Sequence, residues 1–209
     1  MKQLFLTSSV NIVAHDIAKR LDLASHNKLV FITTPAEPET GDKTWLKNDR
    51  LSLVKAGFKV TDYTITGKKP DQLKNDLIDY DFIYLSGGNT LYLLKQSQKT
   101  GFIHLVRDLV NKQGKTYIGT SAGSIIAGPK CPDYLLERDE VMEVEKQKGY
   151  GLVNFTILPH WGSKDFKDKY LKGRLQIAYK VNQVPLLLLT DTQYVHVKDN
   201  KCEVVDVAK

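Results

Sequence analysis

The chain has 209 residues, 42% of them hydrophobic and 26% charged, and a formal net charge of +6. This apolar fraction is that of a globular protein and excludes wholesale disorder. A membrane-spanning helix needs about 20 apolar residues, far more than the four of Leu186–Leu189. The apolar segment at the start is also too short for a signal peptide. We therefore expect one cytoplasmic domain over residues 1–209, with no membrane association.

The basic residues do not indicate a nucleic-acid-binding protein. The lysines are scattered over several helical segments, and no dense arginine run alternates with aromatic residues. The two cysteines, Cys131 and Cys202, are too few for a disulfide framework or a zinc cluster. We expect no nucleic-acid partner, no metal and no cofactor.

Apolar runs typical of buried strands alternate with helical patterns over the first 127 residues. This alternation predicts an α/β fold, in which helices cover both faces of a mostly parallel sheet. Strands are expected at Lys2–Thr7, Lys28–Thr33, Phe58–Ile65, Asp81–Ser86 and Thr116–Thr120. Helices are expected at Val10–Leu21 behind an N-cap at Ser8 or Ser9, Lys43–Ala56, Asp71–Ile78, Leu91–Gln98, Phe102–Gln113 and directly after Ser121.

The pattern changes after Gly128. Residues 129–150 hold prolines, glycines and mixed charges, which favour an irregular excursion over a separate domain. The elements expected beyond it are a strand at Phe155–Leu158, an amphipathic basic helix at Lys164–Tyr179, a buried strand at Leu186–Thr190, and a hairpin of Gln193–Val197 with Cys202–Val207 about Asp199-Asn200.

Residues 119–123 read Gly-Thr-Ser-Ala-Gly and fit G-x-S-x-G where a strand should turn into a helix. A serine at such a turn needs small neighbours, because larger side chains would collide with the adjoining strand and helix. Gly119 and Gly123 meet this need, so Ser121 is the candidate nucleophile. The N–H of Ala122, at a helix N-terminus, is a candidate oxyanion donor. A tight βα turn in a nucleotide-binding or inert fold is the alternative.

A second glycine loop, Ser86-Gly87-Gly88-Asn89-Thr90, ends the preceding strand of the predicted sheet. Carboxyl ends of neighbouring parallel strands lie at one edge, where ligands bind. Gly88 is therefore a candidate second oxyanion donor, and Asn89 or Thr90 is expected to cap the next helix. A phosphate-binding turn is the alternative, although neither a Walker lysine nor G-x-G-x-x-G is present.

A serine nucleophile needs a base. His160 follows the strand Phe155–Leu158 directly and is the candidate, whereas the other four histidines are expected to be structural or solvated. An acid that orients the imidazole is also needed, and spacing does not choose among Asp133, Glu137, Asp139, Glu140 and Asp191.

The strand followed by GGNT, then GTSAG, then a strand ending in Pro-His resembles the peptidase E (aspartyl dipeptidase) and cyanophycinase family of serine peptidases. The resemblance covers most of the chain and implies a flavodoxin-like three-layer sandwich, similar to class I glutamine amidotransferases. It implies Ser121 as nucleophile, His160 as base, and the Gly88 and Ala122 amides as oxyanion donors. It places the acid between serine and histidine, where Glu137 is nearest by alignment.

The same resemblance implies a small-substrate enzyme that prefers an N-terminal aspartate. Arg174 stands where the family places an arginine that would grip the substrate's first side chain, although it could also be one more charge on a basic helix. With Asn89 as a further substrate-binding residue, the expected function is a serine-type peptidase acting on short peptides such as Asp-Xaa dipeptides. An esterase and a catalytically silent binding domain are the alternatives. A monomer and a homodimer both remain open.

Overall fold

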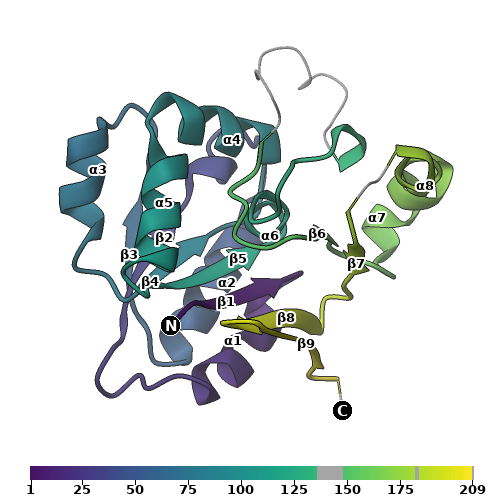
Figure 1. Ribbon diagram of the computed structural model, residues 1–209. Helices are drawn as coiled ribbons and strands as arrows, with labels where there is room; N and C mark the ends of the chain where they lie inside the picture. Colours follow the sequence, from purple (N-terminus) through teal and green to yellow (C-terminus); the bar gives the residue numbers. More distant parts are fainter. Residues whose placement is uncertain (136–147, 182–183, 209) are drawn as a thin grey trace.

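A seven-stranded mixed sheet forms the centre of the computed structural model, which describes residues 1–135, 148–181 and 184–208 (Figure 1). Its strand order is β3-β2-β4-β5-β1-β8-β9. The first five strands run parallel, whereas β8 is antiparallel to β1 and β9 to β8. The strands are β1 (Gln3–Thr7), β2 (Lys28–Ile32), β3 (Lys59–Tyr63), β4 (Phe82–Leu85), β5 (Thr116–Thr120), β8 (Gln193–Lys198) and β9 (Lys201–Asp206).

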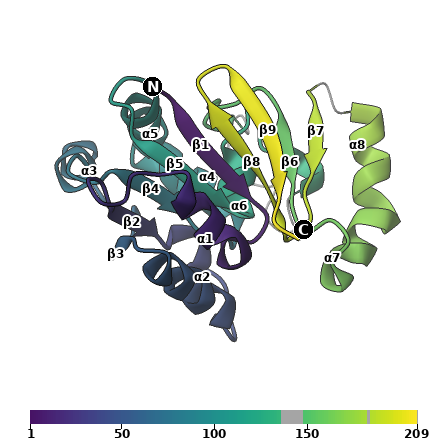
Figure 2. The same cartoon turned by 90° about the horizontal axis from the view of Figure 1, so that it is seen from below.

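Helices cover both faces of this sheet, because its strands alternate their side chains between two apolar cores. Leu4 and Leu6 of β1 face one core, and Phe5 faces the other. Figure 2 shows α1 and α2 on one face and α3 to α5 on the opposite one. The predicted three-layer α/β arrangement is thus confirmed. The helices up to this point in the chain are α1 (Val10–Lys19), α2 (Thr44–Lys55), α3 (Pro70–Leu77), α4 (Thr90–Lys99), α5 (Phe102–Asn111) and α6 (Ala122–Ile126), with a 3₁₀ turn η1 (Thr34–Ala36).

Side-chain caps were predicted for α4 and for α1, and only the cap of α4 is confirmed. The Asn89 side chain caps α4 as expected, since its Oδ1 accepts a hydrogen bond of 2.7 Å from the Tyr92 backbone N–H. Ser9 occupies the N-cap position of α1, but its side chain makes no capping hydrogen bond. Instead its hydroxyl bonds Asn11 Oδ1, and Ser8 is engaged elsewhere. The expectation that a serine side chain caps the backbone N–H groups of α1 is therefore wrong.

A second sheet of two parallel strands, β6 (Thr156–Leu158) and β7 (Leu186–Leu188), lies outside the main sheet. The expectation of a buried strand at 186–190 is wrong, because β7 pairs on one side only and leaves Leu188 38% exposed. The hairpin of β8 and β9 is confirmed, with Asp199 at φ 51° in its turn.

The basic segment after His160 is not one regular helix. Gly173 has non-helical backbone angles, and the turn around it is wider than an α-helical turn. The segment lies beside β7, at the far side of the molecule from α2 (Figure 2). Its parts are α7 (Lys164–Lys169), a π-type turn η4 (Tyr170–Arg174) and α8 (Leu175–Val181).

Within the described ranges, the excursion contributes a 3₁₀ turn, η2 (Asp133–Leu135), and a bridge between Lys130 and Lys148. Among the helices that the structure describes, each is too short or too polar to cross a bilayer.

Candidate active site

The carboxyl ends of β1, β4 and β5 meet at one edge of the main sheet, and the residues after β6 and β7 face them. A cavity of about 610 Å³ opens at this edge. It is lined by residues from segments far apart in the chain, among them Ser8, Asp49, Gly88, Ser121, His160, Lys169, Arg174 and Asp191. The topology therefore brings both predicted glycine loops and the predicted histidine to one place.

Ser121 lies at a sharp turn between β5 and α6, with φ 50° and ψ −107°. A non-glycine residue with positive φ is uncommon, and strained conformations of this kind cluster at functional sites. A Cβ at Gly119 would lie 2.7 Å from the Gly123 carbonyl, and one at Gly123 would lie 2.3 Å from the Leu85 oxygen. Only glycine fits at either position, as the steric argument from the motif predicts.

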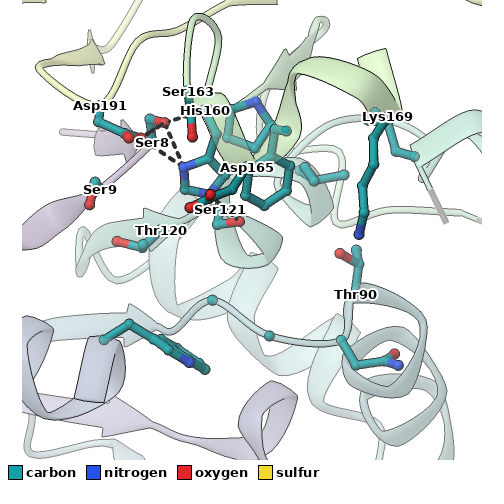
Figure 3. A pocket seen from close by; sticks show the side chains of 18 of the residues that line it. Ser8, Ser9, Thr90, Thr120, Ser121, His160, Ser163, Asp165, Lys169 and Asp191 are labelled. Carbon is teal, nitrogen blue, oxygen red and sulfur yellow. Dashed lines mark hydrogen bonds and ion pairs between the residues drawn. The ribbon is translucent and has the colours of Figure 1, made fainter. Parts of the chain in front are cut away.

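His160 lies beside Ser121 in the cavity, with its Nε2 3.0 Å from the serine Oγ (Figure 3). Its Nδ1 lies 2.7 Å from Oδ1 of Asp191. Because a carboxylate can only accept, the proton sits on Nδ1 and leaves Nε2 free to accept from the Ser121 hydroxyl. The imidazole also stacks on Phe166, with 4.5 Å between ring centroids.

Of the five carboxylates that the sequence left open, Asp191 is placed at the histidine. Its hydrogen bond from His160 lowers its pKa below the usual value, Ser8 contributes in the same direction, and burial opposes both. The predicted acid Glu137, with Asp139 and Glu140, lies outside the described residues. Asp191 was a candidate only by its position after a strand.

Ser8 is a site residue that the sequence reasoning missed. It is fully buried, its hydroxyl donates to Asp191 Oδ1 at 2.8 Å, and it accepts a 2.6 Å hydrogen bond from the His160 backbone N–H. That backbone has φ 59°, a conformation that needs support in a non-glycine residue. Thr7 pairs with Thr120 in the parallel register, so Ser8 and Ser121 follow neighbouring strands. The position of Ser8 directly after the first predicted strand was the sequence signal that could have identified it as a site residue.

The second glycine loop packs against the turn η1. Gly88 has φ 120°, and a Cβ there would lie 2.3 Å from the Pro35 oxygen. Asn89 N donates to the same oxygen at 2.8 Å. The backbone of this loop is therefore held tightly at the cavity wall, next to Ser121.

Two cationic side chains, Lys169 and Arg174, line the cavity from α7 and η4. Lys169 extends toward Thr90 on the side away from Asp191 (Figure 3). The Arg174 guanidinium lies 5.9 Å from the centroid of the Tyr170 ring. The Tyr170 hydroxyl in turn donates to the Pro159 carbonyl at 2.5 Å, which ties this basic wall to the strand before His160.

Metal-ligating side chains do not cluster in the described part of the chain: no three His, Cys, Asp or Glu groups there could hold an ion together. Of the two cysteines, Cys131 is buried and Cys202 is exposed.

Comparison with known proteins identifies the family. The model of peptidase family S51 matches residues 4–205. An uncharacterized peptidase of Listeria innocua is 32% identical over 170 residues, 80% of each chain. Peptidase E of Shewanella sp. (strain ANA-3) is 40% identical over 115 residues, 54% of this chain and 47% of that one. A crystal structure of a candidate peptidase E protein from Listeria monocytogenes EGD-e superposes with a TM-score of 0.87 over all of both chains, at 24% identity. This last likeness confirms the expected fold, which is class I glutamine amidotransferase-like.

Proposed function

The chain belongs to peptidase family S51, a family of serine peptidases, and we propose that it hydrolyses short peptides through Ser121, His160 and Asp191. The observation that carries this proposal is the 3.0 Å approach of His160 Nε2 to the hydroxyl of a serine on a strained strand-to-helix turn. Nucleophile and base within hydrogen-bond reach, with a third group orienting the base, is the arrangement that acyl transfer requires.

In the proposed reaction, Ser121 Oγ attacks the scissile carbonyl while His160 Nε2 takes the hydroxyl proton. The same proton then passes to the leaving amine as the carbon–nitrogen bond breaks. Water, deprotonated by His160, adds to the acyl-enzyme and releases the acid with regeneration of Ser121. Asp191 accepts from Nδ1 throughout and stabilises the imidazolium that forms in each half-reaction.

The negative charge on the carbonyl oxygen needs preorganised donors. We assign these to the backbone N–H groups of Gly88 and Ala122. Ala122 begins α6, and the first N–H groups of a helix have no partner within it. Gly88 is at the cavity wall and has no side chain that would cover its backbone N–H.

The cavity supports a small, acidic substrate such as an Asp-Xaa dipeptide. Its volume of about 610 Å³ lies in the range of small-molecule sites. Lys169 and Arg174 supply positive charge on one wall, and guanidinium groups bind carboxylates in two-pronged pairs. Asn89 lines the same cavity and would contact the bound peptide.

Kinetics with a dipeptide panel test this proposal. We expect the wild-type protein to hydrolyse Asp-Xaa dipeptides and Ser121→Ala to lose at least about 10³-fold in kcat. A fluorophosphonate probe should label Ser121 in the folded protein. Equal turnover by the two proteins would contradict the mechanism. Ester hydrolysis without peptide hydrolysis would favour an esterase, and absence of labelling would favour a silent domain.

A further inference from the structure

Asp49 is a carboxylate of the cavity that the proposed reaction does not use. It lies on α2, is only 4% exposed, and lines the same cavity as Ser121. The Tyr84 hydroxyl donates to its Oδ2 at 2.9 Å, and the Asn11 backbone N–H also bonds it. Both donors are neutral, and across the described ranges no lysine or arginine forms an ion pair with it.

A buried anion without a cationic partner is energetically unfavourable. Burial raises the pKa of Asp49 to about 6, against the lowering effects of Tyr84, Asn11 and the nearby His160. At neutral pH the group is therefore an anion whose charge is incompletely compensated. A cation entering the cavity would supply the missing partner.

Asp49 and the cations Lys169 and Arg174 line different sides of the cavity, whose other carboxylates are Glu39, Asp165 and Asp191. Asn11 belongs to the first turn of α1, next to Ser9, and Figure 3 shows Ser9 and Thr120 on the opposite side of Ser121 from Lys169. The Tyr84 hydroxyl that contacts Asp49 also contacts the side chain of Thr120, the residue before Ser121. Asp49 is therefore close to the reacting serine, on the side away from the basic wall.

We propose that Asp49 binds the free α-ammonium group of the substrate and so restricts this peptidase to peptides with an unblocked amino terminus. The α-ammonium is the one cation that every unblocked peptide carries, and it is two bonds from the first carbonyl carbon. A zwitterionic dipeptide would then lie across Ser121 with its cation toward α2 and its carboxylates toward α7. This inference rests on the proposed peptidase function and adds its terminal specificity.

The kinetic test compares Asp-Leu with its Nα-acetylated form, which differ only in the terminal charge. Wild-type protein should favour the free dipeptide strongly. Asp49→Asn should reduce kcat/KM for the free form by about 10- to 100-fold, mainly through KM, and leave the acetylated form unchanged. Because the two substrates are compared within each variant, partial unfolding cancels from the ratio. Asp42→Asn removes an exposed carboxylate near the start of α2 and should leave the ratio at its wild-type value.

A calorimetric binding test in the Ser121→Ala background does not depend on catalysis. The same two peptides are titrated at pH 7 and pH 5, with and without Asp49→Asn. We expect the preference for the free amine to vanish in Asp49→Asn and to weaken at pH 5, where Asp49 becomes protonated. An unchanged preference in Asp49→Asn, or equal binding of both peptides to the parent protein, would overturn the inference. If the wild-type protein hydrolysed neither peptide while the Ser121→Ala protein still bound the free amine preferentially, the proposed peptidase reaction would be refuted and the role of Asp49 in binding would stand.

Discussion

Asp191 and His160 stand 31 residues apart in the chain, yet Oδ1 of one lies 2.7 Å from Nδ1 of the other. The two residues follow the paired strands β7 and β6, in which Leu158 is opposite Leu188. The register is extended beyond the strands by hydrogen bonds from Leu189 N to Leu158 O and from Trp161 N to Leu189 O. The small second sheet therefore sets the distance between imidazole and carboxylate.

Replacement of Asp191 by asparagine should remove the negative charge that stabilises the imidazolium and favour the wrong tautomer of His160. We expect kcat to fall by about 10³- to 10⁴-fold, with a smaller change in KM. Steady-state kinetics on the best dipeptide measures this effect. Glu137→Gln is the informative companion, since the family resemblance implied Glu137 as the acid. A large loss in Glu137→Gln with little loss in Asp191→Asn would reverse the assignment.

The sequence predicted those parts of the site that depend on local sterics. Gly119 is required by a close contact within the strand-to-helix turn, and Gly123 by the end of the neighbouring strand at Leu85, so the motif identifies Ser121 from sterics around a single turn. His160 was found because Pro159-His160 directly follows an apolar strand. Both signals lie within a few residues of the side chain they identify.

The remaining site residues depend on pairings that local patterns do not contain. Asp191 is chosen by the register between β6 and β7, and a run of four leucines does not reveal which strand it joins. Ser8 matched the pattern of a helix N-cap, whereas the fold directs its hydroxyl to Asp191. Gly173 interrupts a segment whose apolar spacing indicated one helix.

Removal of the Ser8 hydroxyl should impair catalysis without abolishing it. Ser8→Ala leaves the His160 backbone N–H and Asp191 each without one partner. We expect kcat to fall by about 10- to 100-fold, corresponding to one or two lost hydrogen bonds with charged or strained groups. Ser8 lowers the pKa of Asp191, so this pKa should rise in Ser8→Ala. Ser9→Ala is the matched control because, among the side chains that the structure describes, the Ser9 hydroxyl bonds Asn11 and neither His160 nor Asp191. An equal loss in both variants would argue against the positioning role.

Gly88 should not tolerate a side chain. Gly88→Ala places a Cβ 2.3 Å from the Pro35 oxygen at a φ of 120°, so the loop must shift. We expect a loss of about 2–4 kcal/mol in the free energy of unfolding, from steric overlap and backbone strain together. Urea denaturation measures it. At Gly87 a Cβ meets ordinary contacts of 3.5 Å, so Gly87→Ala should remain within about 1 kcal/mol of the wild type. Similar losses in the two variants would contradict the steric argument.

Arg174 should determine preference for an acidic first residue. Arg174→Met keeps much of the side-chain volume and removes the guanidinium from the cavity wall. We expect kcat/KM for Asp-Leu to fall by about 10- to 100-fold relative to Asn-Leu. Lys172→Met is the control, because Lys172 is on the same segment but pairs with Asp168 at 2.8 Å in solvent. If both variants lower the Asp-over-Asn ratio alike, the preference arises from the general positive field and not from Arg174.

The contribution of Asp49 to the free energy of unfolding should be less favourable at neutral pH than in mild acid. Its pKa is about 6 in the folded chain and 3.8 in the reference state, so the folded state binds more protons between these values and stability falls as pH rises through them. Two pKa units correspond to about 3 kcal/mol. Asp49→Asn should abolish this slope and, after loss of the Asn11 hydrogen bond worth about 1 kcal/mol, stabilise the protein by up to about 2 kcal/mol at pH 7.

Urea denaturation at pH 4 and pH 7 measures the difference between wild type and Asp49→Asn, in which contributions from Asp191 and other groups cancel. If Asp49 served only to accept the hydrogen bond from Asn11 in the first turn of α1, its replacement would lower the free energy of unfolding at both pH values. A variant that gains stability at pH 7 while losing its preference for free amino termini would show instead that this carboxylate is retained for substrate recognition at the expense of stability.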